Sequence, residues 1–195
     1  MTSPQPIETD QPVLRLDGIA KSFGNAVALE NVSLSFRHGT VTALTGENGS
    51  GKSTIAKIVG GLLAPDAGQV IIDGVVRRLN DPNAARRQGI ALISQELTLA
   101  ADLTVAENIF MGRQPVGSWR RIDRHRMYAE AAALFDRLGV AIDPRRPARG
   151  LSIADQQILE IAKAISLDAS LLIMDEPTNH LDAETVAWLE RYLHD

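Results

Sequence analysis

The chain has 195 residues, of which 45% are hydrophobic and 23% are charged, an ordinary composition for a globular domain with one sizeable core. Its net charge of -4 gives no general case for nucleic-acid binding, and the absence of cysteine excludes disulfides and thiolate metal sites. No apolar run approaches the roughly 18 residues of a membrane helix, and the polar N-terminus lacks the apolar stretch of a secretion signal. We therefore expect an intracellular protein.

Three prolines within residues 1–12 predict a flexible tail. Val13–Leu16 and Val32–Phe36 then have the pattern of strands, and the second run alternates apolar and polar residues. We expect the two to form an antiparallel sheet beside the loop that follows. Phe23 lies between them, and its ring could stack on an adenine or pack against the sheet. Without further context, packing is the favoured interpretation.

The strongest motif lies in the segment from Val41 to Val59, VTALTGENGSGKSTIAKIV. It predicts a short buried strand at Val41–Thr45, a glycine-rich loop at Gly46–Gly51 and a helix that begins at Lys52. The spacing fits G-x-x-x-x-G-K-[ST], in which glycines let backbone N–H groups curl around phosphate oxygens at a helix N-terminus. Lys52 can reach the β- and γ-phosphates, and the Ser53 hydroxyl can bind Mg²⁺. The segment predicts nucleotide phosphate binding.

Two further strands are expected at Gln69–Asp73 and Ile90–Ser94. Gln95 follows the second strand directly, and ligands bind beyond the carboxyl ends of strands in open α/β sheets. A polar residue is also a common way for a chain to leave a strand. Gln95 alone is therefore a weak signal.

Helix-forming residues dominate residues 97–150 and predict a helical insertion. Thr104–Phe110 begins with an N-cap threonine and has Glu107 at the spacing of a capping box. Arg124–Leu138 is a second helix, with Gly139 as its C-terminal stop. The apolar residues of this helix share one stripe: Met127, Ala131, Leu134, Phe135 and Leu138.

The same insertion is rich in arginine. From Arg113 to Arg149 there are nine arginines against four acidic residues, a local excess of five positive charges. Together with Trp119 they could form a patch that faces nucleic acid or lipid. A solvated helical face is the favoured interpretation.

The last part of the chain combines a capped helix with an acidic strand end. Ser152 is a candidate N-cap for the helix that follows it, and either an ordinary capped helix or an anion-facing N-terminus fits the pattern. Leu171–Met174 predicts a buried strand, at whose carboxyl end Asp175 and Glu176 face the nucleotide side of the sheet. Asp175 is placed to hold Mg²⁺, and Glu176 can orient and deprotonate an attacking water.

Taken together, these segments resemble the ATP-binding cassette (ABC) ATPases over nearly all of residues 13–195. GENGSGKST resembles the Walker A loop, LLIMDE resembles Walker B with its catalytic glutamate, Gln95 matches the Q-loop, LSIADQQ the signature and NHLD the D-loop. The resemblance implies an α/β, P-loop NTPase (RecA-like) core with an antiparallel β subdomain and an inserted α-helical subdomain. The expected divisions are a tail at 1–12, a first core part at 13–96, a helical subdomain at 97–150 and a last core part at 151–195.

Site residues carry over from the family by position. The resemblance implies catalytic roles for Glu176, Lys52 and Gln95. It also implies Mg²⁺ binding by Ser53, Gln95 and Asp175. ATP would contact Phe23, Gly46, Glu47, Asn48, Gly49, Ser50, Gly51, Lys52, Ser53 and Thr54, together with Ser152 of an opposite cassette in trans.

Within the family, GIALISQELTLAADLTVAENIFMGR and LSIADQQILEIAKAIS are similar to the first cassette of ribose-, galactose- and xylose-type sugar importers. This likeness implies an ATP-hydrolysing motor, paired with a second cassette and bound peripherally at the cytoplasmic face of the membrane. It would energise a separate membrane permease, and a separate sugar-binding protein would choose the sugar. No direct contact with nucleic acid is expected.

An alternative is a soluble ABC ATPase that acts on ribosomes or nucleic acid, which DEPTNHLD and the arginine-rich insertion favour. A non-hydrolysing ATP sensor is a third possibility, which follows only if the chain ending at Asp195 is the natural product. The importer-like segments are longer, so the motor is preferred.

The sequence also departs from the family pattern. Ile153 and Ala154 replace two glycines of the signature, and Asp155 replaces glutamine. The sequence ends at Asp195, before the strand expected to carry the switch histidine, and His194 is not a convincing substitute. We therefore expect a truncated cassette that binds ATP but hydrolyses it weakly. Nothing in the sequence identifies the sugar.

Overall fold

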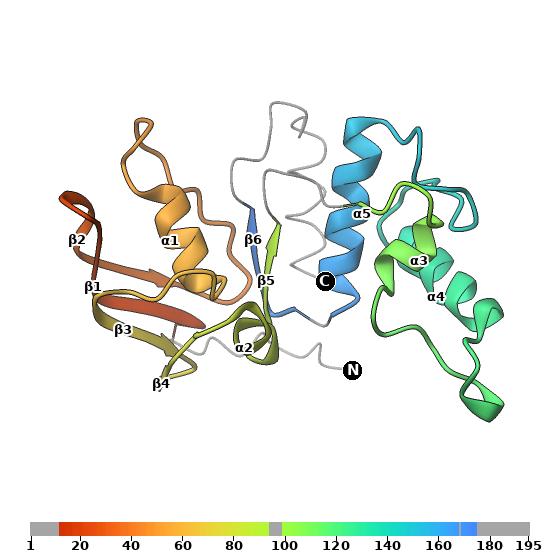
Figure 1. Ribbon diagram of the computed structural model, residues 1–195, viewed down its shortest axis with the longest axis horizontal. Helices are drawn as coiled ribbons and strands as arrows, with labels where there is room; N and C mark the ends of the chain where they lie inside the picture. The colour runs from red at the N-terminus through yellow and green to blue at the C-terminus, as the bar shows by residue number, and fades with distance from the viewer. Residues whose placement is uncertain (1–11, 94–98, 168, 175–195) are drawn as a thin grey trace, which may run out of the picture. The chain divides into compact units, whose positions relative to one another are not determined.

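The computed structural model describes residues 12–93, 99–167 and 169–174. Strands and helices in these ranges make an α/β chain that divides into two compact units (Figure 1). The first unit extends through Gln88, and the second begins at Gly89. Each unit is described by itself below.

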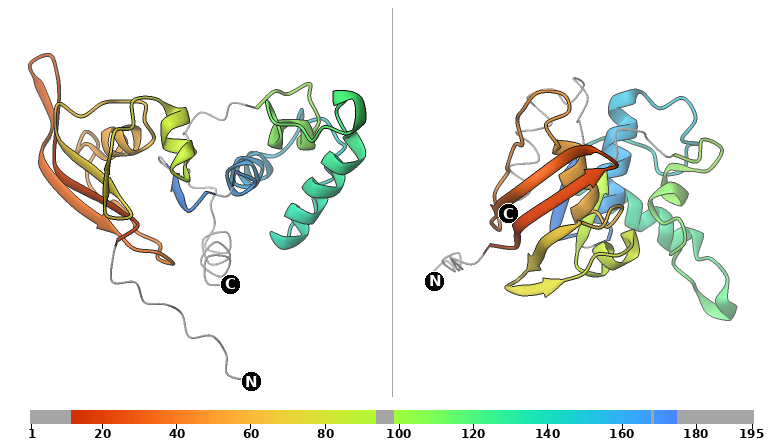
Figure 2. Two further views of the ribbon diagram at one scale, coloured as in Figure 1. Left: turned by 90° about the horizontal axis from the view of Figure 1, so that it is seen from below. Right: turned by 60° about the vertical axis from the view of Figure 1, so that its left-hand side comes forward.

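A four-stranded antiparallel sheet forms the base of the first unit (Figure 2). Its spatial order is β2-β1-β3-β4. The predicted antiparallel pair is confirmed, and both strands are longer than expected because Gly24, at a φ of +58°, lets the chain reverse between them. The bounds of the strands are β1 (Leu14–Phe23), β2 (Ala26–Phe36), β3 (Ala67–Ile72) and β4 (Val75–Arg77).

Two helices complete the first unit. α1 (Lys52–Val59) begins where the motif predicts, and Ile55, Ala56, Ile58 and Val59 on it are buried. α2 (Pro82–Arg87) was not predicted; its start is defined by the Asp81 carboxylate, which accepts a hydrogen bond from the Ala84 N–H at 2.9 Å. β4 was also not predicted, because three residues are too few for a periodic signal.

The strand expected at Val41–Thr45 is absent, so that prediction is wrong. These residues are exposed and have no regular secondary structure. A strand exists only where a neighbour takes up its backbone N–H and C=O groups. None of the four strands of this unit pairs with Val41–Thr45, although the segment has the composition of a buried strand.

A parallel strand pair and a helical cluster form the second unit. β5 (Ile90–Ile93) pairs with β6 (Leu171–Met174) in parallel, from Ile90 opposite Leu171 to Ile93 opposite Met174. The helical elements are α3 (Val105–Ile109), the short 3-10 turn η1 (Ser118–Arg120), α4 (Arg124–Arg137) and α5 (Ile153–Ile165).

The sequence signals for these helices are confirmed. Thr104 and Glu107 form both halves of the capping box at the start of α3. Gly139 ends α4 with a φ of +63°, as a C-terminal stop requires. The whole predicted stripe of α4 is buried in a core shared with α3 and α5: Met127, Ala131, Leu134, Phe135 and Leu138.

Among the residues that the structure describes, one polar side chain is buried beside this core. Asn108 is fully buried on α3, accepts a hydrogen bond from the Ala100 N–H at 2.9 Å and donates to the carbonyl oxygens of Ala100 and Thr104 at 3.1 and 3.0 Å. Its carboxamide therefore ties the segment before α3 to the helix. No described helix is both long enough and apolar enough to cross a membrane.

Candidate nucleotide-binding site

The glycine-rich loop before α1 depends on backbone conformations that favour glycine. Gly49 and Gly51 have φ values of +84° and +90°. A Cβ on Gly51 would also lie 2.5 Å from Leu29 Cδ2 and 2.7 Å from the Ala28 oxygen, both on β2. Gly51 is therefore required by its conformation and by the strand behind it, whereas Gly49 has open space around it.

The body of the loop is a tight turn. The Ser50 N–H donates a hydrogen bond to the Glu47 carbonyl at 3.1 Å, and a Cβ on Gly46 would lie 2.6 Å from Ser50 Oγ. The hydrogen bond closes the turn between Glu47 and Ser50, and the nearby Ser50 Oγ leaves no room for a side chain at Gly46. Asn48 completes it, and like the rest of residues 46–50 it is exposed.

The Lys52 side chain folds back over this loop. Its ammonium donates hydrogen bonds to the carbonyl oxygens of Gly46 at 2.8 Å and Glu47 at 2.9 Å. An ammonium has three donors, so two carbonyls can hold it while one donor is left for a phosphate oxygen. The positive charge of Lys52 is thus positioned at the loop by the loop's own backbone.

The N-terminus of α1 adds to this positive potential. Gly51 is the N-cap, no side chain caps the helix, and no acidic residue lies in its first turn. The first backbone N–H groups and the helix dipole are therefore available to an anion. Ser53 and Thr54 are half-buried in that first turn.

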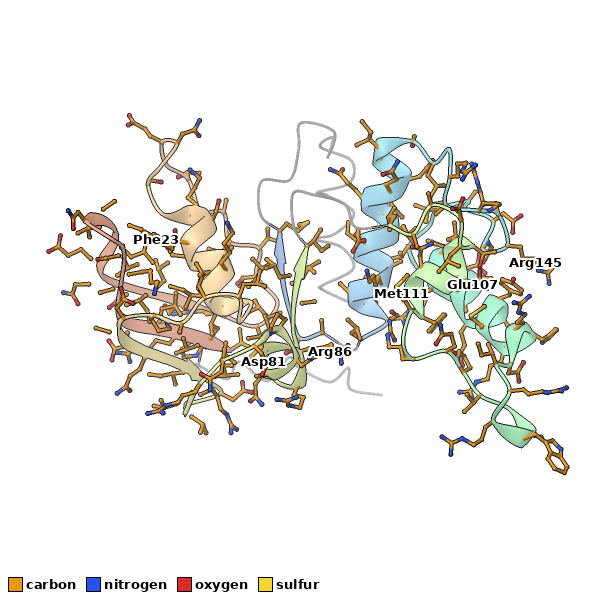
Figure 3. The ribbon with its side chains drawn as sticks, in the orientation of Figure 1. Phe23, Asp81, Arg86, Glu107, Met111 and Arg145 are labelled. Atoms are coloured by element: carbon orange, nitrogen blue, oxygen red, sulfur yellow. The ribbon has the colours of Figure 1, made fainter. Side chains whose placement is uncertain are left out.

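Phe23 lies at the end of β1 in the same unit (Figure 3) and is 50% exposed. The Lys21 ammonium lies 5.9 Å from the centroid of its ring and also pairs with Asp66 at 2.6 Å. The hydrogen bond from Lys21, and then that from the Ser22 backbone, lower the pKa of the Asp66 carboxyl. Phe23 is thus an exposed ring beside a fixed cation.

Ser152 is the N-cap of α5, as expected. Its hydroxyl oxygen accepts a hydrogen bond from the Asp155 N–H at 3.1 Å and donates to the Asp155 carboxylate at 2.8 Å. Both residues of this cap are partly or fully exposed. Asp155 therefore completes the cap at the position where the family pattern has glutamine.

The predicted site residues Gln95, Asp175 and Glu176 lie outside the described part of the chain, as do the predicted D-loop at Asn179–Asp182, residues 1–11 of the predicted tail, and His194. The structure does describe β5, which precedes Gln95, and β6, which precedes Asp175 and Glu176. In this pair, Ile93 of β5 lies opposite Met174 of β6. The carboxyl ends of the two strands therefore meet at one edge, as the sequence argument for an acidic strand end assumed.

The described residues contain no cluster of three or more histidine, aspartate or glutamate side chains that could hold a metal. Of the predicted Mg²⁺ ligands, Ser53 is the one that the structure describes. A separate pocket of about 310 Å³ in the first unit shares no residue with the predicted site; it is lined by Val76, Arg77, Arg78, Ala84, Arg87 and Gln88.

Comparison with known families identifies the chain. A family model described as "ABC transporter" matches residues 29–179, which is more than half of the sequence. The chain belongs to the ABC transporter family. The family prediction made from the motifs is confirmed.

Relatives of this ABC protein are named for sugar import. A ribose import ATP-binding protein of Streptomyces avermitilis is 58% identical over 178 residues, which cover 91% of this chain and 35% of that protein. A ribose import ATP-binding protein of Rhodococcus jostii is 51% identical over 175 residues, covering 90% of this chain and 35% of that protein. A putative ribose/galactose/methyl galactoside import ATP-binding protein of Burkholderia cenocepacia is 47% identical over 181 residues, covering 93% and 34%. The chain therefore spans about a third of the length of these relatives, and they give no support to the ribosome-associated alternative.

Solved structures confirm the fold. The ADP conformation of an ATP-binding cassette of an ABC transporter matches with a TM-score of 0.78 and 26% identity, covering 94% of this chain and 76% of that one. A dimeric bacterial ABC transporter cassette matches with a TM-score of 0.73 and 25% identity, covering 92% and 81%. The ABC chain has the α/β fold of the P-loop NTPases.

Sequence reasoning missed the groups that support the site. Ala28 and Leu29 lie far from the loop in the chain, and only the close approach of β2 to Gly51 reveals their role. The pair between Lys21 and Asp66 beside Phe23 has no signal in the spacing of these residues.

Proposed function

We propose that this chain is the ATP-binding and ATP-hydrolysing cassette of an importer for a monosaccharide. The observation that carries the proposal is the phosphate loop, in which the Lys52 ammonium is held by the carbonyls of Gly46 and Glu47 beside an uncapped helix N-terminus. The printed names of the relatives support the sugar-import part of the proposal.

In this proposal the loop binds the phosphates of ATP through backbone N–H groups, through Lys52 and through Thr54 at the start of α1. Ser53 and Asp175, with Gln95, would hold Mg²⁺, which when bound neutralises charge on the β- and γ-phosphates. Glu176 orients the attacking water and takes its proton. Positioning and electrostatics provide most of the catalysis, because phosphoryl transfer needs little covalent help from the protein.

The remaining residues act around the nucleotide. Phe23 stacks on the adenine, where its exposed ring leaves room for a flat partner. Ser152 of a second cassette closes over the γ-phosphate in trans, and the Ser152–Asp155 cap holds the first turn of α5 in the conformation required. Gln95 couples the state of the nucleotide to the helical subdomain at residues 97–150.

The partners follow from the same proposal. The cassette pairs with a second cassette and binds a separate membrane permease at the cytoplasmic face of the membrane. A separate sugar-binding protein supplies the substrate, and no direct contact with nucleic acid is required. The dimeric form of a matching cassette supports the pairing.

Binding of a fluorescent ATP analogue tests the site. Because a charge-assisted hydrogen bond contributes about 1.5–3 kcal/mol, Lys52→Ala should weaken binding by about 10- to 150-fold. The matched control is Lys57→Ala, which removes an exposed lysine from the last turn of the same helix and should leave the affinity within about twofold. Equal affinity of the Lys52→Ala and parent chains would contradict the proposed site.

Two further assays test hydrolysis and import separately. Glu176→Gln should abolish phosphate release while it preserves binding of the analogue. In the source cells, Lys52→Ala should abolish uptake of a labelled monosaccharide, and Lys57→Ala should preserve it. Uptake that persists in the Lys52→Ala strain would refute the importer role, and the conclusion about nucleotide binding would stand.

A further inference from the structure

A projecting hairpin between α3 and α4 is not used by the proposed ATPase. This hairpin, residues 115–123, extends beyond the rest of its unit in Figure 1 and in the right-hand view of Figure 2. The Gly117 N–H donates to the Arg121 carbonyl at 2.9 Å, and the Asp123 N–H donates to the Pro115 carbonyl at 2.8 Å. Two hydrogen bonds therefore hold the two arms of the hairpin together and define its end.

The hairpin presents apolar side chains to solvent. Trp119 is 94% exposed, and Val116 and Ile122, which pair across the hairpin, are 60% and 51% exposed. These three side chains are therefore exposed to solvent and are not part of the buried helical core. Exposed apolar surface of this kind marks a site of interaction.

The backbone at the end of the hairpin is strained. Trp119 and Arg120 have φ values of +64° and +57°, a conformation that L residues other than glycine, asparagine and aspartate rarely adopt. Among the described residues, the other non-glycine positions with positive φ are Asn31 and Asp73, whose side chains tolerate it. Such strain persists where the surrounding structure imposes it, and here it coincides with the exposed indole.

Two arginines follow Trp119 directly in the hairpin. Arg120 and Arg121 are exposed and form no ion pair with any described residue, whereas the nearby Arg124 and Arg126 pair with Glu107 and Glu130 at 3.8 and 2.7 Å. The chain as a whole carries a net charge of -4. The hairpin itself carries Arg120 and Arg121 against Asp123, which is a local excess of one positive charge.

We propose that this hairpin inserts into an anionic lipid surface, with Trp119, Val116 and Ile122 among the acyl chains and Arg120 and Arg121 on the headgroups. Tryptophan and arginine are the side chains suited to the two layers of a membrane interface. The proposal concerns lipid contact alone and does not depend on ATP hydrolysis or on the permease.

Other partners fit the hairpin less well. Single-stranded nucleic acid needs a groove with successive aromatic platforms, whereas Trp119 is a single ring flanked by two aliphatic β-branched residues. A protein interface needs about 800 Å² on each partner, with anchors centred in a shaped patch. A narrow projecting end suits a fluid partner, which requires no complementary shape.

Fluorescence of Trp119 tests the insertion directly. The chain has two tryptophans, so the variant Trp188→Phe makes Trp119 the sole reporter. We expect its emission to shift to shorter wavelength with vesicles of phosphatidylcholine and phosphatidylglycerol, and the shift to weaken as salt screens the charges. No shift with these vesicles, or an equal shift with pure phosphatidylcholine vesicles, would overturn the proposal.

Sedimentation with the same vesicles tests the residues. An arginine near an anionic surface contributes about 1 kcal/mol, which is about fivefold in affinity, so the double variant Arg120→Gln/Arg121→Gln should bind about 25-fold more weakly. The matched control, Arg86→Gln/Arg87→Gln, removes the same charge from exposed arginines of α2 and should change binding less than twofold. Trp119→Ala should also lose binding while its circular dichroism stays that of the parent. Equal losses of vesicle binding in the two double variants would overturn the proposal, as would unchanged vesicle binding of Trp119→Ala. Binding of single-stranded RNA by the hairpin without binding of vesicles would also overturn it.

Discussion

The substitution Gly51→Ala separates two reasons why the phosphate loop needs glycine. At a φ of +90°, any L side chain costs about 1–2 kcal/mol. The new Cβ would also meet Leu29 Cδ2 at 2.5 Å and the Ala28 oxygen at 2.7 Å. Because the second contact is with backbone, β2 or the loop must shift, and overpacking of this kind costs about 1–3 kcal/mol more.

Gly49→Ala is the matched control. Gly49 has a similar φ of +84°, but nothing lies within 4 Å of its Cβ position. Both substitutions also lower the conformational entropy of the unfolded chain to the same extent. This stabilises each variant by about 0.4–1 kcal/mol and offsets part of the loss. These shared contributions cancel in the difference, so Gly51→Ala should lower the free energy of unfolding by about 1–3 kcal/mol more than Gly49→Ala.

Urea unfolding followed by circular dichroism measures this difference, and equal slopes in the two variants are needed for the comparison. Binding of a fluorescent ATP analogue gives a second measurement, and the affinity should fall more in Gly51→Ala because Gly51 is the N-cap of α1. If the two variants unfold at the same urea concentration, β2 does not support the loop and the argument is refuted.

Three further predictions concern the second unit. Asn108→Ala should lower the free energy of unfolding by about 1–3 kcal/mol, because it leaves the Ala100 N–H without its partner, whereas the carbonyls of Ala100 and Thr104 keep the hydrogen bonds from the backbone N–H groups of Leu103 and residue 108. A loss below about 0.5 kcal/mol in thermal unfolding would contradict this. The hydrogen bond from the Thr104 N–H, and then that from its hydroxyl, lower the pKa of the Glu107 carboxyl below its ordinary 4.5. Glu107 therefore stabilises the fold above that pH, and this stabilisation is lost as the pH falls through the lowered pKa. The difference in free energy of unfolding between the parent chain and Glu107→Gln should shrink on acidification. A constant difference from pH 7 to about pH 3 would argue against the hydrogen bonds. Ser152→Ala should lower the free energy of unfolding by about 1 kcal/mol, because α5 loses its N-cap, whereas Ser152→Asn should keep most of that stability. Equal melting temperatures for the two variants would reject the capping role.

Local spacing in the sequence determined the features that depend on neighbouring residues in the chain. The Gly46-to-Lys52 spacing predicted the phosphate loop, and Thr104 with Glu107 predicted the capping box found at α3. The stripe on α4 was equally predictable, because residues three and four apart share one face of a helix whatever lies opposite. The family resemblance followed from the order of such motifs, and the matching family model confirmed it.

Only the tertiary structure decided the features that depend on distant residues. Gly51 needs its missing side chain because β2 passes behind it, and Asn108 is buried because the segment at Ala100 folds onto α3. The strand predicted at Val41–Thr45 does not form, since composition specifies an apolar segment but not the neighbouring strand that would take up its hydrogen bonds. The outward indole of Trp119 was likewise hidden, because a left-handed backbone at a non-glycine residue is imposed by the hairpin around it and has no signal in the residue itself.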